Sequence, residues 1–179
     1  IHRDCHVDSI ERHTREWRLV DQAGARIGVS AIIIATQAPA AATLVETLAP
    51  EAAKALRRIE FASNVSVSLA YDPAAVGQAL TASGLVVDPA EPLEGLRACA
   101  FSSSKLPNRA PAGRVLLRAF FRPTDSSIEG DDTAWSERAV RVLKPILGLT
   151  GSPVATWVAR WPAALPQYAP SHGESVAEA

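Results

Sequence analysis

The sequence contains no methionine, only two cysteines, and no apolar run long enough to cross a bilayer. Cys5 and Cys99 are too few for a disulfide framework, so we expect a reducing compartment. A net charge of −1 supplies no field that would attract nucleic acid. The chain begins at Ile1, and its first residues lack the pattern of a signal peptide. We therefore expect an internal piece of a longer cytoplasmic protein that binds no nucleic acid.

The stretch 29–48, VSAIIIATQAPAAATLVETL, predicts a strand and a helix without a glycine-rich turn between them. Val29 to Ala35 is continuously apolar, which is typical of a strand buried on both faces beside a parallel neighbour. Pro39 fixes φ for a first helical turn, and the alanine-rich segment to Leu48 favours a helix. Because no G-x-G-x-x-G follows the strand, the unit lacks the phosphate loop of a dinucleotide-binding domain.

Shorter patterns on either side of this unit predict antiparallel strands and further helices. Residues 62–71 alternate, with valine, leucine and tyrosine on one face, and Asp131 or Asp132 can cap a helix that ends before Gly148. On that helix Glu137 and Arg141 have the spacing of an ion pair. Helices are expected at 52–58 and 131–147, and strands at 2–12, 17–20, 26–29, 62–71, 84–87, 98–102, 114–122 and 154–161. This order predicts an α+β chain with α/β elements.

Polar residues crowd the start of the chain and raise the hypothesis of a metal site. On a strand, His2, Asp4, His6 and Asp8 would share one face, next to Cys5. A Zn²⁺ site normally takes further ligands from another part of the chain, and the sequence offers no suitable set. We therefore expect a polar strand face and no metal site.

The string Ser102-Ser103-Ser104-Lys105 matches the S-x-x-K motif of penicillin-recognising enzymes. That chemistry also requires S-D-N and K-T-G motifs, and neither is present. The match follows a predicted strand and precedes Pro107, so we expect a loop without catalytic function.

Two strand faces invite a binding hypothesis. Arg114, Arg118 and Arg122 alternate with apolar residues, and their guanidinium groups could hold the carboxylates of a large flat ligand. An ordinary solvated face with extended arginines is the plainer interpretation, and on the pattern alone we favour it. A second face has only small residues, which suits a closely packed helix or, less simply, a ligand: Asn64, Ser66, Ser68 and Ala70.

Three segments together resemble the protoporphyrinogen oxidase family, in the wider flavin-containing amine oxidase and phytoene desaturase superfamily. They are residues 5–63, with the string IIIATQAPA; residues 83–121, with SGLVVDP and SSKLPNRAP; and residues 143–172, with RWPAALPQY. The strings S-S-K-x-P-x-R-A-P and R-W-x-x-A-L-P-Q-Y are the most specific. The resemblance covers nearly the whole chain, in order, as an internal fragment.

This resemblance implies part of a glutathione-reductase-like FAD-binding domain and a mixed, mainly antiparallel substrate-domain sheet with helices. We expect residues 1–60 in the FAD-binding part, 61–161 in the substrate-binding part, and 162–179 returning toward the FAD domain. The implied reaction oxidises protoporphyrinogen IX to protoporphyrin IX in heme biosynthesis, with FAD as cofactor and a tetrapyrrole as substrate. An amine- or polyene-oxidising relative and a non-catalytic binding module remain alternatives. The family also allows peripheral association with the cytoplasmic face of a membrane, and a homodimer.

The resemblance assigns site residues by position. Val7 matches a valine whose backbone meets the adenine end of FAD, and Trp161 matches a tryptophan near the flavin. The substrate-binding candidates are Ser83, Gly84, Val86 and Arg118, and no catalytic side chain is assigned. Two departures leave the substrate open, because Ser83 stands where the family has an aromatic residue and Asp88 where it has proline. Without a phosphate loop, we expect the isolated fragment neither to hold FAD tightly nor to turn over.

Overall fold

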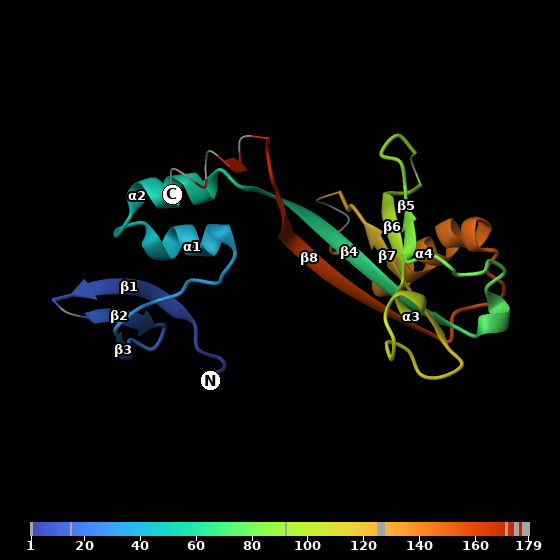
Figure 1. Ribbon diagram of the computed structural model, residues 1–179, viewed down its shortest axis with the longest axis horizontal. Coiled ribbons are helices and arrows are strands. Elements are labelled where there is room, and N and C mark those ends of the chain that lie inside the picture. The colour runs from blue at the N-terminus through green and yellow to red at the C-terminus, as the bar shows by residue number, and fades with distance from the viewer. Residues whose placement is uncertain are drawn as a thin grey trace. The chain divides into compact units, whose positions relative to one another are not determined.

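The computed structural model describes residues 2–14, 16–91, 93–124, 128–170, 172–173 and 176. The chain divides into two compact units, Ile1–Phe61 with Pro166–Ala179, and Ala62–Leu165. Each unit contains helices and antiparallel strand pairs, so the predicted α+β class is confirmed (Figure 1). The assignment of residues 1–60, 61–161 and 162–179 to FAD-binding, substrate-binding and returning parts stays a prediction.

The first unit holds a three-stranded antiparallel sheet of order β1-β2-β3 and two helices. The turn between β2 and β3 forms as expected, because Asp21 Oδ1 accepts hydrogen bonds from the backbone N–H of Ala23 (2.9 Å) and Ala25 (2.8 Å). Prolines start both helices, as the sequence predicts. The elements are β1 Val7–His13, β2 Glu16–Asp21, β3 Arg26–Val29, α1 Ala38–Val45 and α2 Pro50–Arg57.

The segment after Val29 is not the buried strand that its apolar run predicts. β3 ends at Val29, residues 31–35 have no regular structure, and the side chain of Ile33 is 93% exposed. No strand in the described part of the chain pairs with this segment. The prediction is wrong for this chain because a strand is buried on both faces only when neighbouring strands and helices cover it.

The second unit is built on a five-stranded sheet of order β5-β6-β7-β4-β8. The predicted strands are present, whereas the segment expected to be a loop after β6 forms the short helix α3. β8 continues beyond Pro162, where we expected the strand to end, because an edge strand tolerates proline. The elements are β4 Glu60–Tyr71, the 3₁₀ turn Pro73–Ala75, β5 Gly84–Val86, β6 Leu96–Phe101, α3 Ser102–Lys105, β7 Val115–Phe121, α4 Asp132–Leu147 and β8 Ala155–Gln167.

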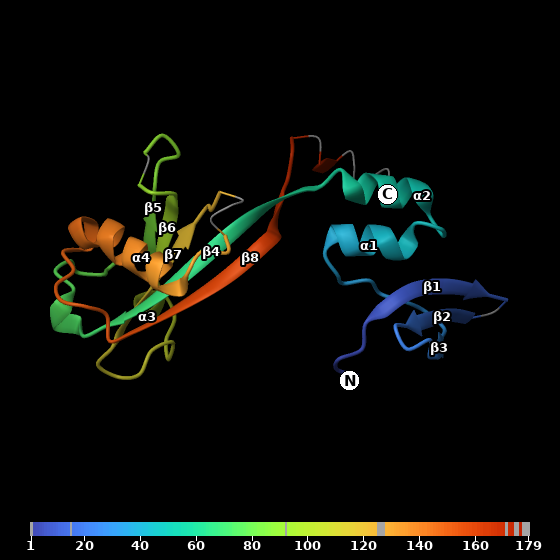
Figure 2. The same cartoon turned by 180° about the vertical axis from the view of Figure 1, so that it is seen from behind.

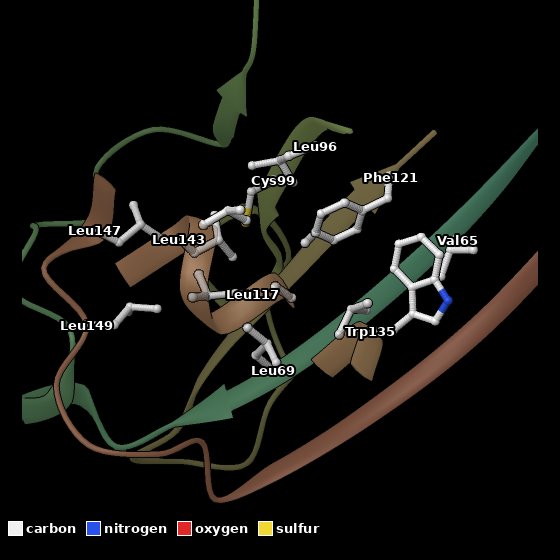
Figure 3. Packing of buried hydrophobic residues seen from close by; sticks show 14 of the residues in the cluster. Val65, Leu69, Leu96, Cys99, Leu117, Phe121, Trp135, Leu143, Leu147 and Leu149 are labelled. Carbon is white, nitrogen blue, oxygen red and sulfur yellow. The ribbon is translucent and has the colours of Figure 1, made fainter. Parts of the chain in front are cut away.

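Helix α4 covers one face of this sheet and forms the core with it (Figures 2 and 3). Asp131 caps the helix by accepting hydrogen bonds from the N–H groups of Thr133 and Ala134, and Gly148 ends it at φ +60°. The ring centroids of Phe121 and Trp135 lie 5.5 Å apart in this core. The apolar residues of β4 that the pattern placed on one face are fully buried here: Val65, Val67, Leu69 and Tyr71.

Two further features concern α4 and its neighbours. Arg141 donates to both carboxylate oxygens of Glu94, at 2.8 and 2.6 Å, so its hydrogen-bonded partner comes from the loop before β6 and is not Glu137. This ion pair lowers the pKa of the Glu94 carboxyl group. Among the described residues, no helix has the length and apolarity needed to span a bilayer.

Candidate functional site

The face of the five-stranded sheet opposite α4 carries most of the residues proposed for the site. Cross-strand pairing aligns Gly84 of β5, Ala100 of β6, Arg118 of β7 and Ser68 of β4 in one row. Residues directly opposite each other in an antiparallel sheet point to the same side. The row therefore brings the predicted substrate-binding residues Gly84 and Arg118 onto one face of the second unit.

A parallel row lies two residues along the strands. It aligns Val86, Ala98, Phe120 and Ser66. Val86 is 87% exposed, so its side chain stands free on this face. Trp161 of β8 joins the row, because its indole Nε1 donates a hydrogen bond to Ser66 Oγ at 3.3 Å.

Ser66 and Ser68 are the side chains that hold Trp161 and Arg118. Arg118 Nε donates to Ser68 Oγ at 3.3 Å, as Trp161 Nε1 does to Ser66 Oγ. We expected a helix against this small-residue face, but α4 packs on the opposite face. Small residues here instead leave space in which an indole and a guanidinium group lie over the sheet.

A cavity of about 430 Å³ opens beside this row. Its floor is the sheet face, with Ser68 and Ala70 from β4 and Leu116 and Arg118 from β7. One wall is the loop segment 109–111, and the other comes from the start of β8. The complete lining is Ser68, Ala70, Arg109, Ala110, Pro111, Arg114, Val115, Leu116, Arg118, Val154, Ala155 and Trp157.

The arginines around the cavity differ in their partners. Arg114 forms an ion pair with Asp72, so its charge is compensated. In the part of the chain that the structure describes, Arg109 and Arg118 have no carboxylate partner. Arg122 does not line the cavity. Of the three arginines that the strand pattern singled out, Arg118 and the ion-paired Arg114 therefore line the cavity. The same pattern missed Arg109, although it lies in the string SSKLPNRAP.

The other substrate-binding candidates have structural roles. A Cβ atom on Gly84 would lie 2.4 Å from the carbonyl oxygen of Cys99, so only glycine lets β5 approach β6 this closely. Ser83 is exposed, and its carbonyl accepts a hydrogen bond from the Phe101 N–H at 3.0 Å. Asp88, which replaces the family's proline, closes a turn through a hydrogen bond from the Ala90 N–H (2.9 Å). The assignment of Ser83 to the substrate stays a prediction.

The two residues proposed to meet FAD lie in different units. Val7 is in the edge strand β1, opposite Asp21, with a register shift between Val7 and Ser9. An edge strand has one side of its backbone free of sheet hydrogen bonds, which fits contact with an adenine ring. Trp161 is 51% exposed and presents a flat indole, which fits packing near a flavin. Each residue thus fits its proposed contact within its own unit.

Arg160, beside Trp161 in the RWPAALPQY string, uses its guanidinium group for bonds within the protein. Its Nε donates to the carbonyl oxygen of Ile128 at 2.9 Å, and a second nitrogen donates to the carbonyl of Gly130. A third nitrogen lies 2.6 Å from Asp132 Oδ1. These bonds tie β8 to the start of α4, on the other side of the strand from the cavity.

The motifs at the start of the chain and after β6 do not form reactive sites. His6 Nε2 lies 3.8 Å from Asp8 Oδ1, and both side chains are exposed. Among the described residues, no group of three or more His, Cys, Asp and Glu side chains is placed to hold a metal. Ser103 Oγ accepts a hydrogen bond from the Leu116 N–H at 3.1 Å, so it anchors α3 to β7.

Comparison with protein families gives a match over nearly the whole chain. The family model of flavin containing amine oxidoreductases matches residues 1–175. A coproporphyrinogen III oxidase of Propionibacterium freudenreichii is 32% identical over 155 residues, which are 86% of this chain and 29% of that protein. One of Mycobacterium tuberculosis with the same name is 34% identical over 169 residues, 92% of this chain and 36% of that protein. The chain therefore spans about a third of the length of these curated relatives.

Solved structures show the same fold. A protein of Exiguobacterium sp. 255-15, provisionally named a protoporphyrinogen oxidase, superposes with a TM-score of 0.74 at 24% identity. The superposition covers 97% of this chain and 37% of that one. A reduced UDP-galactopyranose mutase superposes with a TM-score of 0.69 at 12% identity, over 90% of this chain and 35% of its own. At these identities the likeness shows the fold alone.

Proposed function

Since this chain belongs to the flavin containing amine oxidoreductase family, we propose that it supplies the substrate-binding sheet of an FAD-dependent porphyrinogen oxidase of heme biosynthesis. FAD, when bound, supplies the two-electron oxidising chemistry. The names of the curated relatives support a porphyrinogen as substrate. In this proposal residues 1–60 belong to the FAD-binding part, 61–161 to the substrate-binding part, and 162–179 return to the FAD domain.

The observation that carries the proposal is the open sheet face of the second unit. It places the half-exposed indole of Trp161 and the guanidinium of Arg118 on neighbouring rows, each held by a serine of β4. Val86 adds exposed aliphatic surface to the same face. A flat apolar ring with carboxylate side chains matches such a surface, because the ring covers apolar side chains while an arginine binds a carboxylate.

The protein's own residues have three tasks in this proposal. Trp161 packs against the flavin, and the backbone of Val7 contacts its adenine end. Arg118 orients the tetrapyrrole by a carboxylate, and Gly84 and Val86 line the surface under the ring. Covering this face with a ring excludes water from the reacting carbon atoms. No side chain of the chain is assigned a proton-transfer role.

Two porphyrinogens are candidates for the substrate. The resemblance points to protoporphyrinogen IX, whereas the curated relatives are named for coproporphyrinogen III. Both are tetrapyrroles with carboxylate side chains, and each becomes a flat porphyrin on oxidation. An amine substrate fits less well, because the guanidinium groups of Arg109 and Arg118, which have no carboxylate partner among the described residues, would repel its positive charge. A polyene would leave these cations without a partner.

The test is an assay of the longer, FAD-loaded protein that contains this chain. We expect it to oxidise coproporphyrinogen III or protoporphyrinogen IX to the fluorescent porphyrin under air, and to leave amines unreacted. Trp161→Leu should lower the rate, whereas Trp17→Leu, in the first unit, should not. Oxidation of amines alone, or of neither class, would refute the proposal and favour an amine oxidase or a binding module.

Four subsidiary proposals concern the isolated chain and its surroundings. The 179-residue chain alone should carry no visible flavin absorbance after purification, and stoichiometric FAD would contradict this. We also propose a cytoplasmic protein, with peripheral membrane association and homodimerisation as properties of the longer protein. Vesicle sedimentation and light scattering of that protein test these two properties.

A further inference from the structure

We infer that the cavity beside β4, β7 and β8 is a carboxylate subsite, in which Arg109 and Arg118 bind an acidic side chain of the substrate. The inference rests on the proposed function, since it concerns the ligand of the same sheet face. It assigns a binding role to Arg109 and makes the charge of the substrate's side chains the property that the cavity recognises.

The charges around the cavity support this assignment. Its lining contains Arg109, Arg114 and Arg118, and none of the lining residues is acidic. Asp72 compensates Arg114, which leaves two guanidinium groups without a carboxylate among the described residues. A planar guanidinium binds a carboxylate through two parallel N–H···O hydrogen bonds, so this lining selects a carboxylate over a neutral group.

The remaining contacts hold these groups in place. Ser68 Oγ accepts from Arg118 Nε, and within the described residues the terminal nitrogens of Arg118 have no carboxylate partner. The ion pair of Arg114 with Asp72 fixes the start of β7, directly after the loop that carries Arg109. Arg114 is thus a positioning residue, and Arg109 and Arg118 are the binding residues.

The apolar part of the cavity suits the group that bears the carboxylate. Trp157, Val154 and Leu116 supply surface on which a pyrrole ring edge and its methylene carbons can pack. Ser66, which holds Trp161, and Ser68, which holds Arg118, lie two residues apart on β4, roughly 7 Å by strand geometry. One flat molecule can therefore contact Trp161 and place an acidic side chain in the cavity.

The cavity should therefore distinguish tetrapyrroles by the number of carboxylate groups that they carry. A tetrapyrrole with four propionates can present one to the cavity in more orientations than a tetrapyrrole with two. We therefore expect this chain to bind coproporphyrin III more tightly than protoporphyrin IX, and to lose that preference when the cations are removed.

The experiment measures equilibrium binding of both porphyrins to the longer protein that contains this chain. Quenching of tryptophan fluorescence reports the binding, with Trp157 in the cavity wall as a reporter. Arg109→Met and Arg118→Met keep the side-chain length and remove the charge. Each should raise the Kd for coproporphyrin III by about tenfold, and raise the Kd for protoporphyrin IX less. Arg122→Met is the matched control, because Arg122 comes directly after the same strand but does not line the cavity. The Kd of this variant for coproporphyrin III should stay within twofold of the wild-type value.

Three outcomes would overturn the inference: unchanged affinity in both cavity variants, the same loss in Arg122→Met, or equal losses for the two porphyrins. Near-ultraviolet circular dichroism, which reports on the buried Trp135, checks that the variants fold. The inference and the proposed function fail separately. Arginine-dependent porphyrin binding by a protein that oxidises no porphyrinogen would refute the function alone, whereas oxidation with unaltered variant affinities would refute this inference alone.

Discussion

Removing the side chain of Arg160 should loosen β8 without removing any side chain that lines the cavity. The guanidinium of Arg160 donates to the carbonyl oxygens of Ile128 and Gly130 and lies 2.6 Å from Asp132 Oδ1. Arg160→Met keeps the length and the apolar stem but loses all three contacts. β8 then remains at the sheet edge by its pairing to β4 and by its bonds to the serines of that strand, such as the one from Trp161 Nε1 to Ser66 Oγ.

The expected magnitude follows from the number and exposure of these contacts. A hydrogen bond to a charged group contributes about 1.5–3 kcal/mol when buried. Only 26% of the Arg160 side chain is exposed, but 64% of Asp132 is, so the ion pair contributes at the low end. Ordering the long side chain offsets part of the gain. We therefore expect Arg160→Met to lower the free energy of opening of β8 by about 2–3 kcal/mol, or roughly 30- to 160-fold in the opening equilibrium.

Hydrogen exchange of the peptide that covers residues 155–167 measures this opening directly. Arg97→Met is the control, because Arg97 lies in the same sheet and makes one long bond, 3.4 Å, to the carbonyl of Pro89. In Arg97→Met the free energy of opening of β8 should change by less than about 1 kcal/mol. Exchange in β8 that is no faster in Arg160→Met than in Arg97→Met would show that these bonds do not hold the strand.

Two buried polar groups of the core give further predictions. Burial raises the pKa of the Cys99 thiol to about 12, from 9.0, so the folded chain should lose stability as the pH rises from 9 toward 12, and Cys99→Ala should lose less. At neutral pH a thiol reagent should modify the exposed Cys5 quickly and Cys99 only after unfolding. The hydroxyl of Tyr71 is buried without a hydrogen-bond partner among the described residues, so Tyr71→Phe should leave the free energy of unfolding unchanged or raise it by about 1 kcal/mol.

Each of these predictions has an outcome that contradicts it. The sign for Cys99 follows from its raised pKa, because the folded state holds the thiol proton more tightly than the unfolded chain. The contribution of this thiol to the free energy of unfolding is therefore fully present below pH 9 and is lost as the pH rises toward 12. An identical alkaline denaturation profile in wild type and Cys99→Ala would exclude this account, and fast modification of both thiols would show that the core opens. A loss of more than 1 kcal/mol in Tyr71→Phe would show that the hydroxyl does have a stabilising partner.

The sequence predicts local structure well where a single element decides the outcome. The alternation in β4 places Val65, Val67 and Leu69 on the buried face, because strand side chains alternate regardless of what lies elsewhere. Asp131 and Gly148 bound α4 as expected, because capping involves only neighbouring backbone groups. These features need no knowledge of the tertiary fold.

Features that depend on distant residues could not be predicted in the same way. Ile33 is exposed although its run is apolar, because burial requires a covering element. Arg141 binds Glu94, 47 residues away, in preference to the residue one helical turn from it. Likewise, Arg109 reaches the cavity from a loop, and no strand pattern indicates that. The resemblance placed Trp161 in the site and the strand pattern offered Arg118, but only the folded structure shows that two serines of β4 hold them.

The two prolines of β8 have a consequence for how this sheet meets other molecules. β8 lies at one edge of the sheet, and Pro162 and Pro166 lie within it, four residues apart. Proline in an edge strand makes that strand a poorer template for pairing with a strand of another chain. At the opposite edge β5 is only three residues long. The domain is thereby protected at both margins against strand-by-strand growth into aggregates, while its broad face stays available for a ligand.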